Sequence, residues 1–220
     1  MKFRIDLKIL FFLGLFFLSR QLDIYLIVLF FTFLHEIAHL IVGATLRLKP
    51  QYIEMTPFGF WISFKPRIQD YREKIKKSNV IELKYIMVAI AGPLFNLFLV
   101  MVMGNNFKFL GENTIQQKIL YTNFLIFLFN LIPIYPLDGG RIFRSLFRIY
   151  LGKKAADQSI NILANISVIV LTIAGSIAIL YLKNIAVLVV LAYLWELVIL
   201  ENKRFKLKKK IWNLSSEYKN

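Results

Sequence analysis

The sequence contains no cysteine and only two histidines among its 220 residues. The absence of cysteine excludes disulfide bonds, thiolate nucleophiles, iron–sulfur clusters and zinc sites built on cysteine. Acidic residues are also scarce, because 13 Asp and Glu stand against 28 Lys and Arg and leave a formal net charge of +15. Any metal or acid–base chemistry must therefore rest on two imidazoles and a few carboxylates.

Apolar residues are abundant: they make up 58% of the chain, and the mean hydropathy is +0.60. One soluble core would not bury so much apolar surface. Six apolar stretches approach the ~20 residues that a helix needs to cross ~30 Å of hydrocarbon, and they lie at roughly 7–19, 22–46, 85–107, 118–136, 159–182 and 184–201. We expect an all-α polytopic membrane protein with about six transmembrane helices, in which residues 1–201 form the membrane domain and residues 202–220 a basic cytoplasmic tail.

The Lys and Arg residues gather on one side of these stretches. With the N-terminus inside, 24 of the 28 fall in cytoplasmic segments, and the four on the opposite side are Arg20, Lys108, Lys118 and Lys183. The positive-inside rule therefore predicts a multi-pass protein of the cell membrane with both termini cytoplasmic. Because topology and anionic lipid headgroups account for the net charge, we expect the lipid bilayer as a partner and no nucleic acid.

A segment between the second and third stretches, residues 52–64, is too short to span a membrane and is interrupted by Pro57 and Gly59. Its large apolar side chains alternate along one face: Phe58, Phe60, Ile62 and Phe64. This period of two predicts a small membrane-associated β-hairpin. Its edge, around Phe58, Gly59 and Phe60, could bind an extended peptide by strand addition. An interfacial aromatic anchor without substrate contact is an equally good interpretation.

The two histidines lie four residues apart in the second apolar stretch, as His35-Glu36-Ile37-Ala38-His39. On a helix, residues i and i+4 share one face, so both imidazoles can bind one ion. The glutamate between them can act as a general base while contributing no ligand. Ionisable residues within a membrane span are costly and mark functional sites. This pattern predicts one zinc ion per chain, bound by His35 and His39, with Glu36 as the catalytic base.

Catalytic zinc usually has three protein ligands and an open position, so a third ligand is needed. With no further histidine, it must be a carboxylate, and the candidates in or at the end of later stretches are Asp138, Glu196 and Glu201. Asp138 is favoured because prolines before it break the helix and glycines after it permit a tight turn. Glu196 and Glu201 are expected to reach the inner interface instead.

Two asparagines lie within apolar stretches, Asn96 and Asn130. Either amide could bind the substrate backbone or the developing oxyanion. Hydrogen bonds between helices explain both asparagines equally well.

Three segments carry a family resemblance: Phe33 to His39, the run Ala91-Gly92-Pro93-Leu94-Phe95-Asn96, and Asn130 to Arg141 with its Pro-Leu-Asp-Gly-Gly core. In this order they resemble the site-2 protease family of intramembrane zinc metalloproteases, and within it the stage IV sporulation protein FB type. The resemblance implies that His35, His39 and Asp138 bind zinc and that Glu36 activates water. It also implies a membrane-associated regulatory protein as substrate, such as a precursor sigma factor of sporulation, and leaves room for inhibitory membrane-protein partners. The rival interpretation is a non-hydrolytic membrane protein that handles metal ions, as a transporter or sensor.

Overall fold

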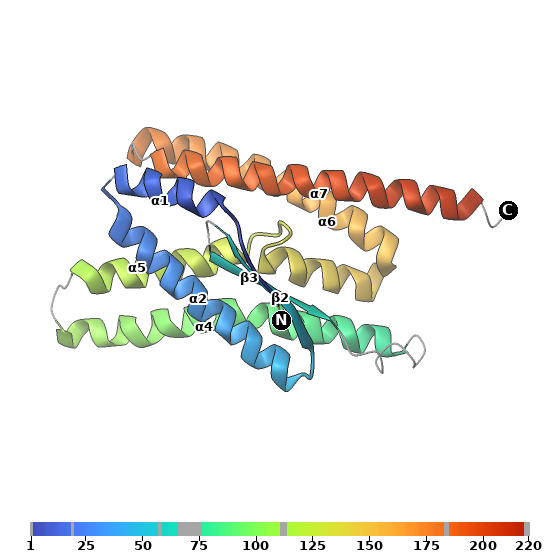
Figure 1. The fold of residues 1–220 in the computed structure, drawn as a ribbon, viewed down its shortest axis with the longest axis horizontal. Coiled ribbons are helices and arrows are strands. Elements are labelled where there is room, and N and C mark those ends of the chain that lie inside the picture. The colour runs from blue at the N-terminus through green and yellow to red at the C-terminus, as the bar shows by residue number, and fades with distance from the viewer. Residues whose placement is uncertain are drawn as a thin grey trace. The chain divides into compact units, whose positions relative to one another are not determined.

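The computed structural model describes residues 2–18, 20–56, 59–65, 76–110, 114–182 and 185–217. These residues are mostly helical, with three short strands (Figure 1). The chain divides into two compact units, Met1–Leu131 and Ile132–Asn220. Each unit is described in turn.

Each predicted apolar stretch overlaps one helix. The helices are α1 Lys8–Leu18, α2 Leu22–Thr45, α4 Lys76–Leu110 and α5 Thr114–Asn130 in the first unit, and α6 Asp138–Leu182 and α7 Ile185–Glu217 in the second. Within the described part of the chain, three helical segments are long and apolar enough to cross a membrane: Leu22–Thr45, Asn79–Gly104 and Asp138–Tyr181. Several boundaries differ from the prediction: α4 and α6 begin earlier, α7 ends later, and α5 ends at Asn130 rather than near residue 136. Pro133 and Pro136 explain this end, since proline lacks the donor that a helix needs and restricts the residue before it.

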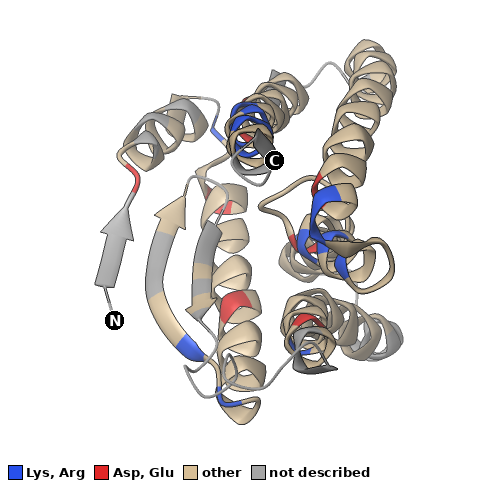
Figure 2. Ribbon diagram, turned by 90° about the vertical axis from the view of Figure 1, so that its right-hand side faces the viewer, with Lys and Arg blue, Asp and Glu red and all other residues tan. Residues whose placement is uncertain are grey.

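Helix α2 buries a row of polar side chains and exposes many large apolar ones. Its buried residues lie along one face: Tyr25, Phe31, Thr32, His35, Glu36, His39 and Gly43. Large apolar side chains such as Phe30, Phe33 and Ile41 are exposed. This arrangement is the reverse of that in a water-soluble helix and is typical of a helix surrounded by lipid. In Figure 2 most of the described helical ribbon is uncharged, and charged residues occupy short segments.

A three-stranded sheet packs against α2 in the first unit. Strands β2 Lys49–Thr56 and β3 Gly59–Lys65 pair antiparallel, with Met55 opposite Phe60. Strand β1, Lys2–Ile5, pairs parallel with the other edge of β2. The sequence predicted two strands and missed β1, because a parallel pairing has no tight turn to signal it. The predicted contact residue Phe58 lies outside the described residues.

The second unit consists of α6 and α7. Gly152 has a φ of 78° and divides α6 into a first arm and a second arm, and the second arm runs beside α7 (Figure 1). An amide cluster joins the two helices: Asn161 and Asn165 each donate to Oδ1 of Asn202, at 2.5 and 3.0 Å. Helix α7 continues unbroken to Glu217. Residues 202–217, predicted as a separate tail, therefore extend the same helix.

Candidate metal centre

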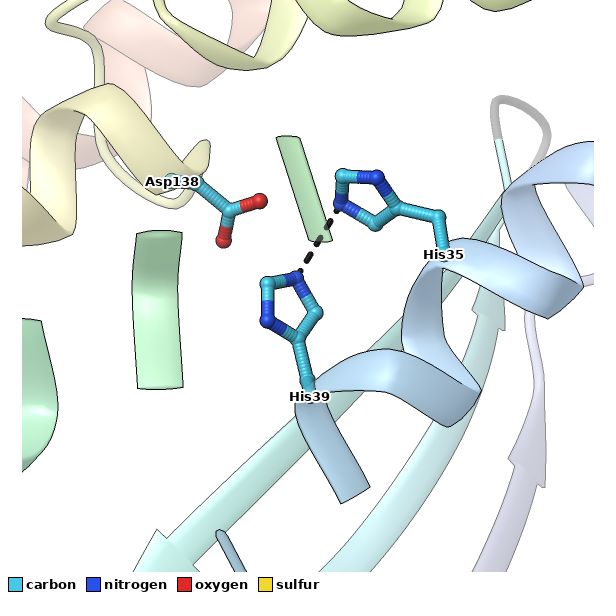
Figure 3. A group of neighbouring side chains, drawn as sticks. All are labelled: His35, His39 and Asp138. Atoms are coloured by element: carbon cyan, nitrogen blue, oxygen red, sulfur yellow. Dashed lines mark hydrogen bonds between the residues drawn. The ribbon is translucent and has the colours of Figure 1, made fainter. Parts of the chain in front are cut away.

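The two histidines of α2 converge as their spacing predicts. Their side chains are buried, with 2% of His35 and none of His39 exposed. The Nε2 atoms lie 3.1 Å apart, joined by the dashed line in Figure 3. Two nitrogens bound tetrahedrally to one zinc ion at ~2.0–2.1 Å would lie about 3.3 Å apart. The observed separation is therefore close to what a shared ion requires.

The opposite ring nitrogens are both held by oxygen acceptors. Nδ1 of His35 lies 2.5 Å from Oδ1 of Asn96, and Nδ1 of His39 lies 2.6 Å from the carbonyl oxygen of Val88. Since these oxygens only accept, each Nδ1 must carry the proton. Each neutral ring then presents an unprotonated Nε2, which is the form that binds metal. The short Nε2–Nε2 distance thus brings two potential ligand atoms together.

A relay of amides fixes which end of Asn96 faces His35. Asn123 donates from Nδ2 to the carbonyl of Ile119 at 2.9 Å, which turns its Oδ1 toward Asn96. Asn96 donates from Nδ2 to that oxygen at 2.8 Å, so its own Oδ1 must point to His35. Because the amide orientation follows from the network, a backbone carbonyl on α5 ultimately sets the tautomer of a histidine on α2.

Gly92 of α4 borders the Nε2 atoms directly. A Cβ atom at this position would clash with both imidazoles and would lie only 2.5 Å from Nε2 of His39. Any larger residue would therefore occupy the space in front of the two ligand atoms. The close approach of this backbone explains why a glycine stands here, a role that the sequence analysis did not assign.

Asp138 is the first residue of α6 and is buried, with 3% of its surface exposed. One oxygen of Asp138 and one nitrogen from each of His35 and His39 all lie within 4.8 Å of one another, and Figure 3 shows the carboxylate turned toward the imidazoles. These three buried side chains could hold a metal ion, as predicted. Two histidines and a carboxylate form a donor set that zinc accepts in catalytic sites.

The segment before Asp138 folds tightly against the start of α6. A Cβ atom at Gly140 would lie 2.5 Å from backbone atoms of Ile134 and Tyr135. A glycine is therefore required for this close packing, rather than for the free turn that the sequence suggested. Arg141, one turn after Asp138, places its guanidinium 3.5 Å from a carboxylate oxygen of Asp138.

The remaining predicted residues have varied surroundings. Glu36 is buried on α2 beside His35. Asn130, at the end of α5, is partly exposed and donates to the carbonyl of Ile126 at 3.1 Å. Gly59 and Phe60 lie in β3. Contact of Asn96, Asn130 or β3 with a substrate stays a prediction.

One expectation about the other carboxylates is wrong. Glu201 does not extend to an interface: it is buried, with 4% of its surface exposed, and pairs with Arg144. A cation from another part of the fold makes burial of this carboxylate tolerable. The sequence does not reveal such a partner 57 positions away.

The fold and the site together define a helical membrane protein with a buried metal-binding group of two histidines and one aspartate. Residues 99–174 match peptidase family M50, a segment that includes Asp138. Zinc metalloprotease MJ0392 of Methanocaldococcus jannaschii is 32% identical over 138 residues, which make up 60% of this chain and 36% of that protein. The chain thus spans about a third of the length of this curated relative.

A solved structure has a similar fold. The site-2 protease from Methanocaldococcus jannaschii aligns with a TM-score of 0.61 and 23% identity, covering 90% of this chain and 89% of that chain. At this identity the likeness shows the fold, and the two sequence matches are to peptidase family M50 and to a zinc metalloprotease.

Proposed function

We propose that this protein is an intramembrane zinc metalloprotease that hydrolyses a peptide bond of a membrane-associated protein. The observation that carries the proposal is the state of the two imidazoles: both Nδ1 atoms are committed to oxygen acceptors, and both Nε2 atoms face the carboxylate of Asp138. A site that only joined helices by hydrogen bonds would not need two imidazole nitrogens at this spacing.

His35, His39 and Asp138 would hold the zinc ion, which supplies Lewis-acid polarisation of water and of the scissile carbonyl when bound. Glu36 accepts a proton from the attacking water as the water oxygen adds to the carbonyl carbon of the substrate. The same carboxylic acid then returns the proton to the leaving nitrogen as the carbon–nitrogen bond breaks.

The substrate is proposed to bind in an extended form. In the described sheet β2 is the central strand, so the outer edge of β3 is a candidate for strand addition, with Gly59 and Phe60 at its start. Of the two asparagines, Asn130 is the better candidate for a substrate contact. It is partly exposed, whereas Asn96 is fully buried and has both amide atoms bonded.

The finer features belong to the same proposal: six spans, both termini cytoplasmic, and a membrane-associated hairpin. The match between helices and apolar stretches supports them, as does the concentration of Lys and Arg in the segments assigned to the cytoplasm. A regulatory protein such as a precursor sigma factor is the proposed substrate, with inhibitory membrane proteins as further partners.

The test is Glu36→Gln, which keeps the shape of the side chain and removes the base. We expect zinc content equal to that of the unaltered protein and cleavage slowed by ~10²–10⁴-fold. Zinc would be measured by elemental analysis of detergent-purified protein, and cleavage with a panel of single-span membrane peptides carrying a fluorophore and a quencher. Cleavage by the variant at the original rate would contradict the role of Glu36. Zinc uptake into proteoliposomes, without cleavage by the unaltered protein, would favour a metal-handling function instead.

A further inference from the structure

A cluster of charged side chains with a buried centre lies in the second unit, apart from the residues proposed to bind zinc. We call it the α6–α7 ion network, and its members are Arg144, Arg148, Asp157, Glu201, Arg204 and Lys208. Its centre is strongly buried: the exposed fractions of the Arg144, Asp157 and Glu201 side chains are 11%, 6% and 5%. Burying charges is expensive unless each has a close partner, so a network of this kind fixes its members in place.

Arg144 is the member that connects three separate parts of the unit. Its guanidinium donates to Oε1 of Glu201 on α7, and its Nε lies 3.4 Å from Oδ1 of Asp157 on the second arm of α6. The same group lies over the ring of Tyr135, 4.3 Å from the centroid. One side chain on the first arm thus contacts the second arm, α7 and the segment that precedes the first arm.

That first arm carries Asp138, and the chain is irregular at both of its ends. Before it lies an irregular segment, residues 132–137, and after it the chain changes direction at Gly152. Close backbone packing at Gly140 joins the start of the arm to the segment before it, but a helix bounded by a loop and a glycine is not oriented in the unit by its own backbone. Side-chain contacts must therefore help to set where Asp138 lies, and Arg144 is only six positions further along the same arm.

We propose that Arg144, acting with Glu201 and Asp157, is a positioning residue that holds Asp138 in place as the third metal ligand. The proposal rests on the assignment of Asp138 as a ligand under the proposed function. Arg144 does not touch the metal or the substrate in this scheme. Its contacts hold the first arm and the segment around Tyr135 against two other parts of the unit, the second arm and α7. They therefore restrict the positions that the Asp138 carboxylate can reach.

The experiment compares Arg144→Gln and Glu201→Gln with a matched control, Arg204→Gln. Arg204 contacts the same glutamate at 4.0 Å, but its side chain is 55% exposed. Zinc affinity is measured on the purified full-length chain by competition with a chromophoric chelator, and the visible absorption of Co²⁺-loaded protein reports the ligand geometry. We expect each buried variant to weaken zinc binding by ~10–100-fold and to alter the cobalt spectrum. We expect Arg204→Gln to change affinity by less than about twofold, as for exposed ion pairs.

Two further variants separate positioning from general stability. If Arg144 and Glu201 act through each other, the variant with both glutamine substitutions should bind zinc no more weakly than the single variant with the lower zinc affinity. Arg144→Lys retains the charge but not the planar group over Tyr135, so its zinc affinity should lie between those of the unaltered protein and Arg144→Gln. Should Arg144→Gln fail to fold, Glu201→Gln and Arg144→Lys decide the question.

Folded Glu201→Gln or Arg144→Gln protein with unaltered zinc affinity and cobalt spectrum would overturn the proposal. A lower melting temperature with an unaltered cobalt spectrum would overturn it too, because that result describes a merely structural role. These readouts do not depend on proteolysis. A protein that binds zinc through Asp138 but cleaves no peptide would contradict the proposed protease activity. That result would not contradict the positioning role of Arg144.

Discussion

The two parts of the candidate metal site are supported by different chemistry. On the histidine side, in the first unit, the contacts are neutral: an asparagine amide and a backbone carbonyl hold the two rings. On the aspartate side, in the second unit, the ligand sits on an arm held by arginine, aspartate and glutamate. Neutral amides cost less to bury than ions, which suits the apolar packing of α2, α4 and α5. Charged pairs instead suit the second unit, where basic residues are frequent.

This difference predicts how substitutions on each side of the site affect zinc binding. Loss of a neutral partner leaves a ring that can still bind metal, though less well oriented. Loss of one ion from a buried pair leaves an uncompensated charge, and the surrounding structure must rearrange. Variants on the two sides can therefore be ranked.

The largest effect is expected on the histidine side, from Gly92→Ala. The added methyl group would fill the space in front of both Nε2 atoms, so zinc binding should fall by more than about 100-fold although every ligand remains. Gly104→Ala is the matched control, because it lies on the same helix and its Cβ would meet only Leu120, at 3.9 Å. Isothermal titration with zinc measures both variants. Unaltered affinity of Gly92→Ala would mean that the ion does not bind between these nitrogens.

A smaller effect is expected from the amide relay. Asn96→Ala removes the acceptor of His35 and should weaken zinc binding by ~10-fold or more, the range seen for partners of metal-binding histidines. Asn123→Ala acts one step further away and should cost less than Asn96→Ala. Asn165→Ala provides the control, since it removes an amide from the cluster between α6 and α7. If Asn123→Ala proved as harmful as Asn96→Ala, the graded relay would be wrong.

The smallest effect is expected from an ion pair on the histidine side. Lys118 on α5 pairs with Asp23 on α2, but their side chains are 42% and 54% exposed. Exposed pairs contribute little, so Lys118→Ala should leave zinc affinity unaltered and shift the melting temperature by less than about 2 °C. Thermal unfolding in detergent checks the shift. A loss of zinc binding in Lys118→Ala would show that an ion pair stabilises the histidine side of the site as well as the aspartate side.

Much of this molecule follows from local sequence patterns. The helices, the pairing of His35 with His39 and the choice of Asp138 follow from apolar length, helical spacing and elimination among a few carboxylates. The helices and the convergence of the three side chains were predictable because each depends on residues close in sequence or on a short list of candidates, and the role of Asp138 as a ligand stays a prediction. The count of membrane spans and the substrate contacts remain predictions.

The features that the sequence did not reveal depend on partners far apart in the chain. The asparagine that binds His35 is 61 positions away, and Asn123 is 27 positions further. The pair of Arg144 and Glu201 spans 57 positions. Periodicity shows which face of a helix is buried, but not which residue of another helix it meets.

The parallel pairing of β1 with β2 has a practical consequence for mapping this protein in a membrane. Under the proposed topology, paired strands outside the hydrocarbon belong to one membrane face, so residues 2–5 and 49–56 would lie on the same side of the bilayer. The proposed spans α1 and α2 between them would then cross the bilayer and return. A single accessibility label in either strand therefore reports the sidedness of both.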